Sequence, residues 1–209
     1  MCRSPGVALG PEVRVRRLTR EFFARDAVHV ARALIGAKLV REAGGLRRAG
    51  TIVETEAYEG PADRACHARF GRTPARRDLF GPPGHAYVFL VYGMHLCFNV
   101  VCATEGAGHA VLVRGVEPDG PDDARGDGPG RVTRALGIGR EAGGVDLVTS
   151  PALYLVEGAG PARAVAASPR VGVSYAGEHA ERPWRFFDPT SPSVSRPPAS
   201  QLGRGREAR

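Results

Sequence analysis

The chain has 209 residues, 43% of them hydrophobic, and a formal net charge of +7. This length is enough to bury a substantial core, as one large domain or two small ones. No apolar run reaches the length of a membrane span, and the N-terminal residues, with Arg3, Pro5 and Pro11, lack the hydrophobic region of a secretory signal. We therefore expect a cytoplasmic protein with no membrane partner.

The positive charge is uneven and is carried almost entirely by arginine. Residues 1–50 hold 11 basic and 4 acidic side chains, whereas residues 101–150 hold 5 and 8. Of the 29 basic residues, only Lys38 is a lysine. Arginine suits bidentate phosphate binding, so the charge favours a polyanionic partner. A solvated basic face would explain the charge equally well.

The cysteines and histidines form no pattern that is typical of a metal site. The four cysteines show no C-x-x-C pair, and none of the six histidines belongs to an H-x-x-x-H pair. We therefore predict no metal and no cofactor. Reduced, mostly buried thiols, as in cytosolic proteins, are the expected state of the cysteines, which are Cys2, Cys66, Cys97 and Cys102.

The N-terminal region predicts a flexible tail and then a helix. Residues 1–11 show no periodicity and read as the tail. Asp26 is a typical N-cap, and the apolar residues of the segment 27–35 recur at helical spacing. Gly36 fits the C-terminal stop of this helix.

A β-hairpin with an unusual face follows the helix. Residues 38–40 and 49–58 read as two strands joined across a Gly-Gly turn. Because side chains alternate along a strand, Glu54, Glu56 and Tyr58 point to the same face. A carboxylate that is partly removed from water is costly unless it is paired or used, so this face is a candidate active site.

The next region predicts short, irregular elements. Residues 63–70 fit a short helix that begins at Asp63, which places His67 at a helix end or loop near the acidic strand. Residues 71–77 form a basic loop of a kind that can bind phosphates. Residues 80–84 contain two adjacent prolines and cannot be regular structure. His67 is compatible with an ordinary surface or core histidine as well as with a ligand-binding one.

An aromatic, β-branched segment, residues 85–101, predicts a hairpin that turns near Gly93. Large apolar side chains would then lie at an exposed tip, which suggests insertion into a partner. A further strand is expected over residues 109–116, with Arg114 as its single charged residue. A charge at such a position is either paired with a carboxylate or faces a cleft.

The C-terminal half predicts a loop, a helix and further strands. Residues 119–130 are rich in Gly, Asp and Pro and read as a mobile loop. Residues 131–138 read as a short helix, and the glycine-rich segment before it offers free amides to an anion. Two strands and an aromatic segment that closes the domain complete this half, at residues 152–157, 170–174 and 182–187.

Together these features suggest a class of chemistry without proving it. Paired carboxylates can hydrolyse a glycosidic bond when one of them activates water. An exposed aromatic wedge on a basic protein favours nucleic acid whose base stack must be opened. An enzyme that flips a base into a pocket and hydrolyses the base–sugar bond would combine the two.

Several longer motifs resemble the 3-methyladenine (alkyladenine) DNA glycosylase family. They occur in the family's order between about residues 17 and 188, and they are I-V-E-T-E-A-Y-E-G-P, H-A-R-F-G-R-T-P, G-P-P-G-H-A-Y-V-F-L-V-Y-G-M-H-L-C-F-N-V-V, V-L-V-R-G-V-E-P, G-P-G-R-V-T-R-A-L-G-I and R-V-G-V-S-Y-A-G-E. The resemblance implies a mixed α/β fold, namely a single domain with a curved antiparallel β-sheet, flanking helices and a protruding β-hairpin. We expect this domain to span residues 12–188, followed by a disordered tail at 189–209.

The resemblance also assigns roles to individual residues. It implies that Glu56 is the general base for water and that Tyr58 stacks on the flipped base, with His67 on the other side of the base. Substrate-binding residues by the same resemblance are Tyr58, His67, Phe89, Asn99 and Arg114. DNA-binding residues are Tyr92, which would enter the duplex in place of the flipped nucleotide, and Arg72, Thr73, Met94, His95 and Arg131.

The chain departs from the family's pattern in two places. Phe89 stands where a tyrosine is frequent, so a hydroxyl contact is lost while stacking is kept. The loop before Gly128 is shorter than is usual in the family and lacks a basic stretch. How strongly this side of the protein binds DNA is therefore left open by the resemblance.

The function implied is that of a monofunctional DNA glycosylase in base excision repair. It would excise alkylated or deaminated purines, such as 3-methyladenine and hypoxanthine, from damaged double-stranded DNA, as a monomer without metal or cofactor, in the cytoplasm or at the nucleoid of a bacterium. Two other classes of protein remain as alternatives. One is a non-enzymatic DNA-damage sensor, and the other is a hydrolase of free nucleosides or sugars.

Overall fold

A computed structural model of the chain describes residues 16–91, 93–120, 124–160 and 162–195. The strands within these residues form one antiparallel sheet in the order β3-β4-β5-β2-β1-β6, with β8 pairing both β2 and β7. Their bounds are Lys38–Ala43 (β1), Leu46–Glu59 (β2), Ala86–Val91 (β3), His95–Cys102 (β4), His109–Pro118 (β5), Leu153–Val156 (β6), Ala166–Ser168 (β7) and Arg185–Phe187 (β8). The α-helices are Arg20–Phe23 (α1), Ala27–Ala33 (α2) and Pro129–Leu136 (α3), and the 3-10 helices are His67–Phe70 (η1), Pro74–Phe80 (η2), Arg140–Ala142 (η3) and Ser174–Ala180 (η4).

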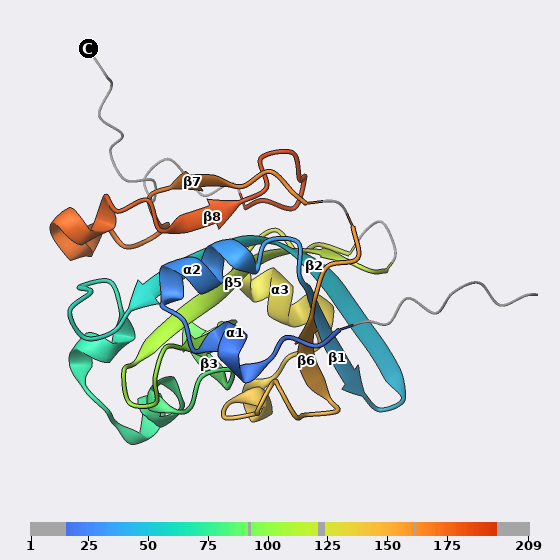
Figure 1. Ribbon diagram of the computed structural model, residues 1–209, viewed down its shortest axis with the longest axis horizontal. Helices are drawn as coiled ribbons and strands as arrows, with labels where there is room; N and C mark the ends of the chain where they lie inside the picture. Colours follow the sequence, from blue (N-terminus) through green and yellow to red (C-terminus); the bar gives the residue numbers. More distant parts are fainter. Residues whose placement is uncertain (1–15, 92, 121–123, 161, 196–209) are drawn as a thin grey trace, which may run out of the picture.

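The long strand β2 is the centre of the sheet. It pairs with β5 along one edge, and along the other edge it pairs first with β1 and then with β8. Figure 1 shows the resulting curvature, with β7 and β8 lying above β2 and β5 and β8 joined to β2 by strand pairing. The prediction of a mixed α/β domain with a curved antiparallel sheet, flanking helices and a hairpin is confirmed.

The predicted N-terminal helix and hairpin are also confirmed. The Asp26 carboxylate accepts a hydrogen bond from the amide of His29 at the start of α2, and Gly36 follows the helix with a φ of 91°. The strands β1 and β2 meet at the Gly44-Gly45 turn. Helix α2 packs on β2 and β5, and α3 packs on β4 and β5.

One face of the sheet packs into the hydrophobic core, and the other face lines a pocket. Alternate residues of β2 to β5 enter the main hydrophobic core with the two helices, among them Ala57, Phe98, Val100, Val111 and Val113. The intervening residues point to the opposite side. There they line a pocket, and they are Glu56, Tyr58, Tyr87, Phe89, Val91, Cys97, Asn99, Ala110, Leu112 and Arg114.

Three expected local structures were wrong. The segment 63–70 is helical only from His67, as the 3-10 helix η1, because the Asp63 carboxylate instead accepts hydrogen bonds from the amides of Glu59 and Ala65. The basic segment 71–77 is not a plain loop, since η2 begins at Pro74. Residues 170–174 do not form a strand, because the buried side chain of Arg170 and the amide of Val171 bind groups of the site described below.

The predicted tails are described only in part. Residues 1–11 and 196–209 lie outside the described residues. Residues 189–195, which the sequence assigns to the start of a disordered tail, instead run along the domain to Ser195, which is buried and hydrogen-bonded to Glu54. The ordered part of the domain therefore extends past the predicted boundary at residue 188.

Candidate active site

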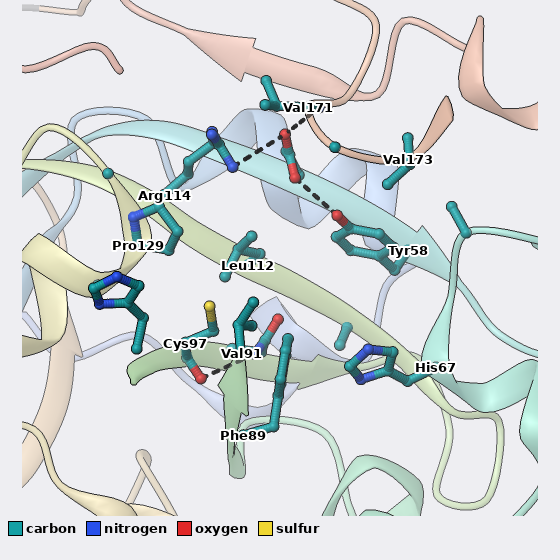
Figure 2. A pocket seen from close by; sticks show the side chains of 18 of the residues that line it. Tyr58, His67, Phe89, Val91, Cys97, Leu112, Arg114, Pro129, Val171 and Val173 are labelled. Atoms are coloured by element: carbon teal, nitrogen blue, oxygen red, sulfur yellow. Dashed lines mark hydrogen bonds and ion pairs between the residues drawn. The ribbon is translucent and has the colours of Figure 1, made fainter. Parts of the chain in front are cut away.

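A pocket of about 660 Å³ opens on the face of the sheet opposite the helix α2, and residues of the N-terminal part of α3 line it. Its floor and walls come from β2, β5, β4 and β3, and the segment 127–131, η1 and residues 171–175 surround it. In Figure 2, Arg114, Tyr58 and Val171 lie along one side, with Phe89 and His67 across from them. The pocket has a polar side and an aromatic side.

Glu56 is the buried acid of the polar side. It is fully buried from bulk solvent, although its carboxylate lines the pocket. Its Oε1 accepts a hydrogen bond of 2.8 Å from the amide of Val171, and its Oε2 accepts one of 2.8 Å from the hydroxyl of Tyr58. Two donors thus fix the orientation of a carboxylate that stands at the pocket wall.

Arg114 lies between the two acids of β2. The register of β2 against β5 shifts twice near Glu54, so that Arg114 has no opposite residue in the pairing. Such bulges re-aim side chains and are frequent next to active sites. The Arg114 guanidinium lies 3.1 Å from Glu54 and 3.7 Å from Glu56. Burial opposes its charge, but the two carboxylates raise the pKa of Arg114 above its ordinary value.

Glu54 is enclosed rather than open. Its carboxylate pairs with Arg185 at 2.6 Å and with Arg114, and it accepts hydrogen bonds from the amide and hydroxyl of Ser195 at 2.7 and 2.8 Å. It does not line the pocket. Both oxygens of this carboxylate therefore have partners inside the protein.

A buried ion pair supports Tyr58 from behind. The Arg170 side chain is fully buried, binds both carboxylate oxygens of Asp63, and donates to the carbonyl of Ala57. The Arg170 guanidinium lies 4.8 Å from the centroid of the Tyr58 ring and 5.0 Å from that of Trp184. Burial and the neighbouring Glu56 raise the pKa of Tyr58, so its hydroxyl stays a donor.

The aromatic side consists of His67, Phe89 and Tyr87. The imidazole of His67 meets Phe89 edge-on, with 4.4 Å between ring centroids, and its Nδ1 lies 3.1 Å from the hydroxyl of Tyr87. Burial, followed by the charges of Arg76 and Arg69, lowers the pKa of His67. Neutral His67 can therefore donate or accept one hydrogen bond on the pocket side.

Asn99 and Cys97 complete the floor. The Asn99 amide nitrogen donates to the carbonyls of Tyr87 and Cys97, which fixes the side-chain orientation. Burial raises the pKa of the Cys97 thiol to about 12, so it stays protonated. The predicted substrate-binding residues Tyr58, His67, Phe89, Asn99 and Arg114 all line this one pocket.

The predicted DNA-binding residues are dispersed around the pocket. Arg131 and His95 line it, although Arg131 is paired with Asp127 at 2.7 Å. Met94 is 73% exposed beside the turn of the β3–β4 hairpin. Arg72 and Thr73 precede η2 and do not reach the pocket wall. Tyr92 lies outside the described residues.

Sequence reasoning missed the residues that hold the site in place. Asp63 and Arg170 were assigned to a helix start and a strand, Val171 contributes only its backbone, and Arg185 and Ser195 were assigned to an aromatic anchor and a tail. The hydrogen bonds and ion pairs of these residues join segments that are more than 100 positions apart in the sequence, as between Arg170 and Asp63. A lone charge in an apolar stretch is the local signal that marks Arg114, and Arg170 within residues 165–173 carries the same signal.

Three further findings concern other features of the described residues. Within the described ranges, no group of three or more His, Cys, Asp and Glu residues could hold a metal ion. The three described cysteines, Cys66, Cys97 and Cys102, are buried and free. No helix in the same part of the chain has the length and apolarity that crossing a membrane requires.

The geometry defines what this pocket can do. An oriented carboxylate beside a guanidinium can accept a proton from water at the polar side. The aromatic rings across from it can hold a flat, unsaturated ring by stacking. The pocket volume also fits a small molecule better than a polymer in extended form.

Comparisons with known proteins agree with this chemistry. The family model for methylpurine-DNA glycosylase matches residues 21–192. A protein of Myxococcus xanthus (strain DK1622), named as a candidate 3-methyladenine DNA glycosylase, is 53% identical over 184 residues, which cover 87% of this chain and 94% of the relative. Proteins with the same name from Anaeromyxobacter dehalogenans (strain 2CP-1 / ATCC BAA-258) and Methanocella arvoryzae are 51% and 45% identical, over 87% and 86% of this chain and 87% and 96% of their own lengths.

Proposed function

Because the chain belongs to the methylpurine-DNA glycosylase family, we propose that this DNA glycosylase flips alkylated or deaminated purines out of duplex DNA and releases them by hydrolysis. The substrates would be of the 3-methyladenine and hypoxanthine class. The observation that carries the proposal is the placement of Glu56, an oriented carboxylate at the wall of an aromatic pocket.

In the proposed reaction Glu56 activates a water molecule. The carboxylate accepts a proton from water while the water oxygen bonds to C1′ of the sugar. The bond between C1′ and the purine nitrogen breaks, and its electron pair stays with the departing base. Arg114, within reach of Glu56 and Glu54, places a positive charge beside the carboxylate that accepts the proton.

The base would lie between Tyr58 and the aromatic side of the pocket. Tyr58, His67 and Phe89 offer stacking and edge contacts to a purine, which are worth roughly 1–3 kcal/mol per stacked base. Asn99 on the floor would disfavour the 2-amino group of guanine. Cationic adducts such as 3-methyladenine need little help to leave, whereas neutral hypoxanthine depends more on these contacts.

The duplex would be held at the edge of the pocket. We propose that Tyr92 enters the space left by the flipped nucleotide, and that Arg72, Thr73, Met94, His95 and Arg131 contact the backbone. Exposed Met94 and the location of His95 and Arg131 at the pocket support this side as the DNA-facing one. The protein would act as a monomer, in the cytoplasm or at the nucleoid of a bacterium.

The reaction would leave an intact abasic site. Strand cleavage by a glycosylase generally requires an amine that forms a Schiff base with the sugar. Lys38 is the only lysine of the chain, and its amine pairs with Asp119 at 2.6 Å. It does not line the pocket.

A panel of duplexes tests the proposal, each carrying one modified purine and scored for release of the free base. Release of 3-methyladenine or hypoxanthine, without strand breaks and without an adduct after borohydride treatment, is expected. Free inosine serves as a second substrate. Hydrolysis of inosine in the absence of any release from duplexes would assign the pocket to nucleosides instead, and binding without release would indicate a damage sensor.

A further inference from the structure

An exposed cluster of arginine and aromatic side chains lies beside the mouth of the pocket. Phe70 at the end of η1 is 56% exposed, and Tyr175 in η4 is 58% exposed. Exposed apolar side chains that gather in one patch mark a contact surface more often than scattered ones do. Tyr175 also lines the pocket, and its hydroxyl donates to the carbonyl of Ala65 at 3.3 Å, which anchors the ring at the rim.

Arg69 is held between these two rings. Its guanidinium carbon lies 4.3 Å from the centroid of Phe70 and 5.2 Å from that of Tyr175. The guanidinium of Arg76 lies 5.3 Å from the same Phe70 ring. Stacking on aromatic faces restricts an arginine side chain and leaves its N–H groups free for a planar acceptor.

The charge of this cluster is not neutralised within the described structure. None of Arg64, Arg69, Arg72 and Arg76 forms an ion pair with a residue of the described ranges. Several other arginines near the surface do, for example Arg47 with Glu42 and Arg163 with Glu117. A local group of unpaired arginines creates a positive potential that attracts an anionic partner.

We infer that Phe70 and Tyr175 clamp Arg69 as a phosphate-binding finger for the DNA strand that enters the pocket. The inference rests on the proposed function, because a nucleotide whose base occupies the pocket holds its phosphates at the rim, and Tyr175 is one of the residues that line the pocket. Arg69 then binds a backbone phosphate adjacent to the flipped nucleotide, and the two rings keep it in position before DNA arrives. Preorganisation of this kind reduces the entropy lost on binding.

The test measures binding of the full-length protein to a duplex with one tetrahydrofuran residue, an abasic-site analogue that cannot be cleaved. Dissociation constants are determined by fluorescence anisotropy over a range of KCl concentrations. Arg69→Ala should weaken binding and lower the magnitude of the log–log salt slope by about 0.9, the value for one lost phosphate contact on duplex DNA. Arg69→Lys should keep the slope.

Phe70→Ala should weaken binding roughly two- to fivefold without changing the protein's charge, because it removes a cation–π contact from Arg69. It should have no effect in an Arg69→Ala background. The matched control is Arg47→Ala, which removes a half-exposed arginine from the β1–β2 hairpin, at the opposite end of the view in Figure 1 from η1 and η2. This control should leave the slope unchanged.

Base release from a duplex with hypoxanthine or 3-methyladenine is measured for each variant in parallel. If the parent protein releases the base while Arg69→Ala keeps the parent salt slope, or Arg47→Ala lowers it equally, the clamp is wrong and the proposed function stands. Equal effects of Phe70→Ala with and without Arg69 would also overturn the clamp. If the parent protein neither binds any of the duplexes nor releases a base from them, both the clamp and the proposed function are wrong.

Discussion

Glu54 and Glu56 are two residues apart on β2, equally buried, and share Arg114, but their surroundings differ completely. Glu54 is closed off by two arginines and by the amide and hydroxyl of Ser195. Glu56 has one distant guanidinium, one hydroxyl and one amide, and its carboxylate stands at the pocket wall. The enclosed carboxylate of Glu54 therefore stabilises the fold, whereas the carboxylate of Glu56, which lines the pocket, can contact a reactant.

The comparison explains how a single strand can supply both acids. Alternation puts them on the same face, and the bulge opposite them turns Arg114 into the space between. Arg114 is drawn toward the closed cluster, at 3.1 Å from Glu54 against 3.7 Å from Glu56. Glu54 and Ser195 thus hold the guanidinium of Arg114 in place beside Glu56.

The largest expected effect is on chemistry at the open acid. Glu56→Gln keeps the shape and an acceptor for Val171 but cannot take a proton from water. We expect base release to fall by about 10²- to 10⁴-fold, the usual contribution of general base catalysis. Single-turnover release from lesion duplexes measures this, and the residual rate should be largest for cationic adducts.

Retained binding of the lesion duplex by Glu56→Gln is the control for folding. Parent-like excision of hypoxanthine by Glu56→Gln, together with a folded but inactive Glu54→Gln, would reverse the assignment of the two acids.

The next effect is on stability at the closed acid. Glu54→Gln leaves Arg185 without its buried counter-charge and leaves Arg114 with Glu56 alone, and breaking a buried pair typically costs about 3–5 kcal/mol. The free energy of unfolding from urea denaturation measures the loss. Glu117→Gln is the matched control, because its partner Arg163 lies near the surface and such pairs contribute at most about 1 kcal/mol. Similar losses in both variants would contradict the distinction.

The sequence allowed the two acids to be found but not distinguished. The period of two along residues 52–58 predicts that Glu54 and Glu56 share a face, and the strand, the hairpin partner and the helix α2 follow from similar local patterns. The choice of Glu56 rests on the family resemblance and on its place one alternation closer to Tyr58 along the strand. What separates the acids is the set of partners, and those partners come from distant segments.

Such partners leave no local pattern. Arg170 binds Asp63 across 107 positions, and Ser195 binds Glu54 across 141 positions. Residues 170–174 resemble a strand in composition, and the segment after Pro189 resembles a disordered one. A single polar side chain that completes a distant cluster changes neither composition nor periodicity, so both predictions followed the local signal and missed the contact.

A smaller effect is expected from Ser195 itself. Ser195→Ala removes a hydrogen bond to Glu54 and one from Arg114 but leaves the backbone amide in place. We expect a loss of about 1–2 kcal/mol in the free energy of unfolding, since hydrogen bonds to charged groups are among the stronger ones. Ser193→Ala, in the same segment, is the control because its side chain forms no hydrogen bond to the acids. Equal losses would show that Ser195 does not stabilise the closed cluster.

The smallest effect concerns how the stability of the protein depends on pH through His67, on the aromatic side of the pocket. Burial and the nearby charges of Arg76 and Arg69 hold the pKa of His67 below its ordinary value of 6.5. The unfolded chain therefore binds a proton at this histidine more readily than the folded protein, so His67 lowers stability as the pH falls through the unfolded pKa. The slope from one histidine is at most about 1.4 kcal/mol per pH unit. His67→Gln should reduce the loss of stability between neutral pH and the lower pKa of the folded protein, as measured by urea denaturation at several pH values. If the parent and His67→Gln lose stability in parallel over this range, the imidazole is not held neutral by its surroundings, and the difference between the open and closed sides does not extend to protonation.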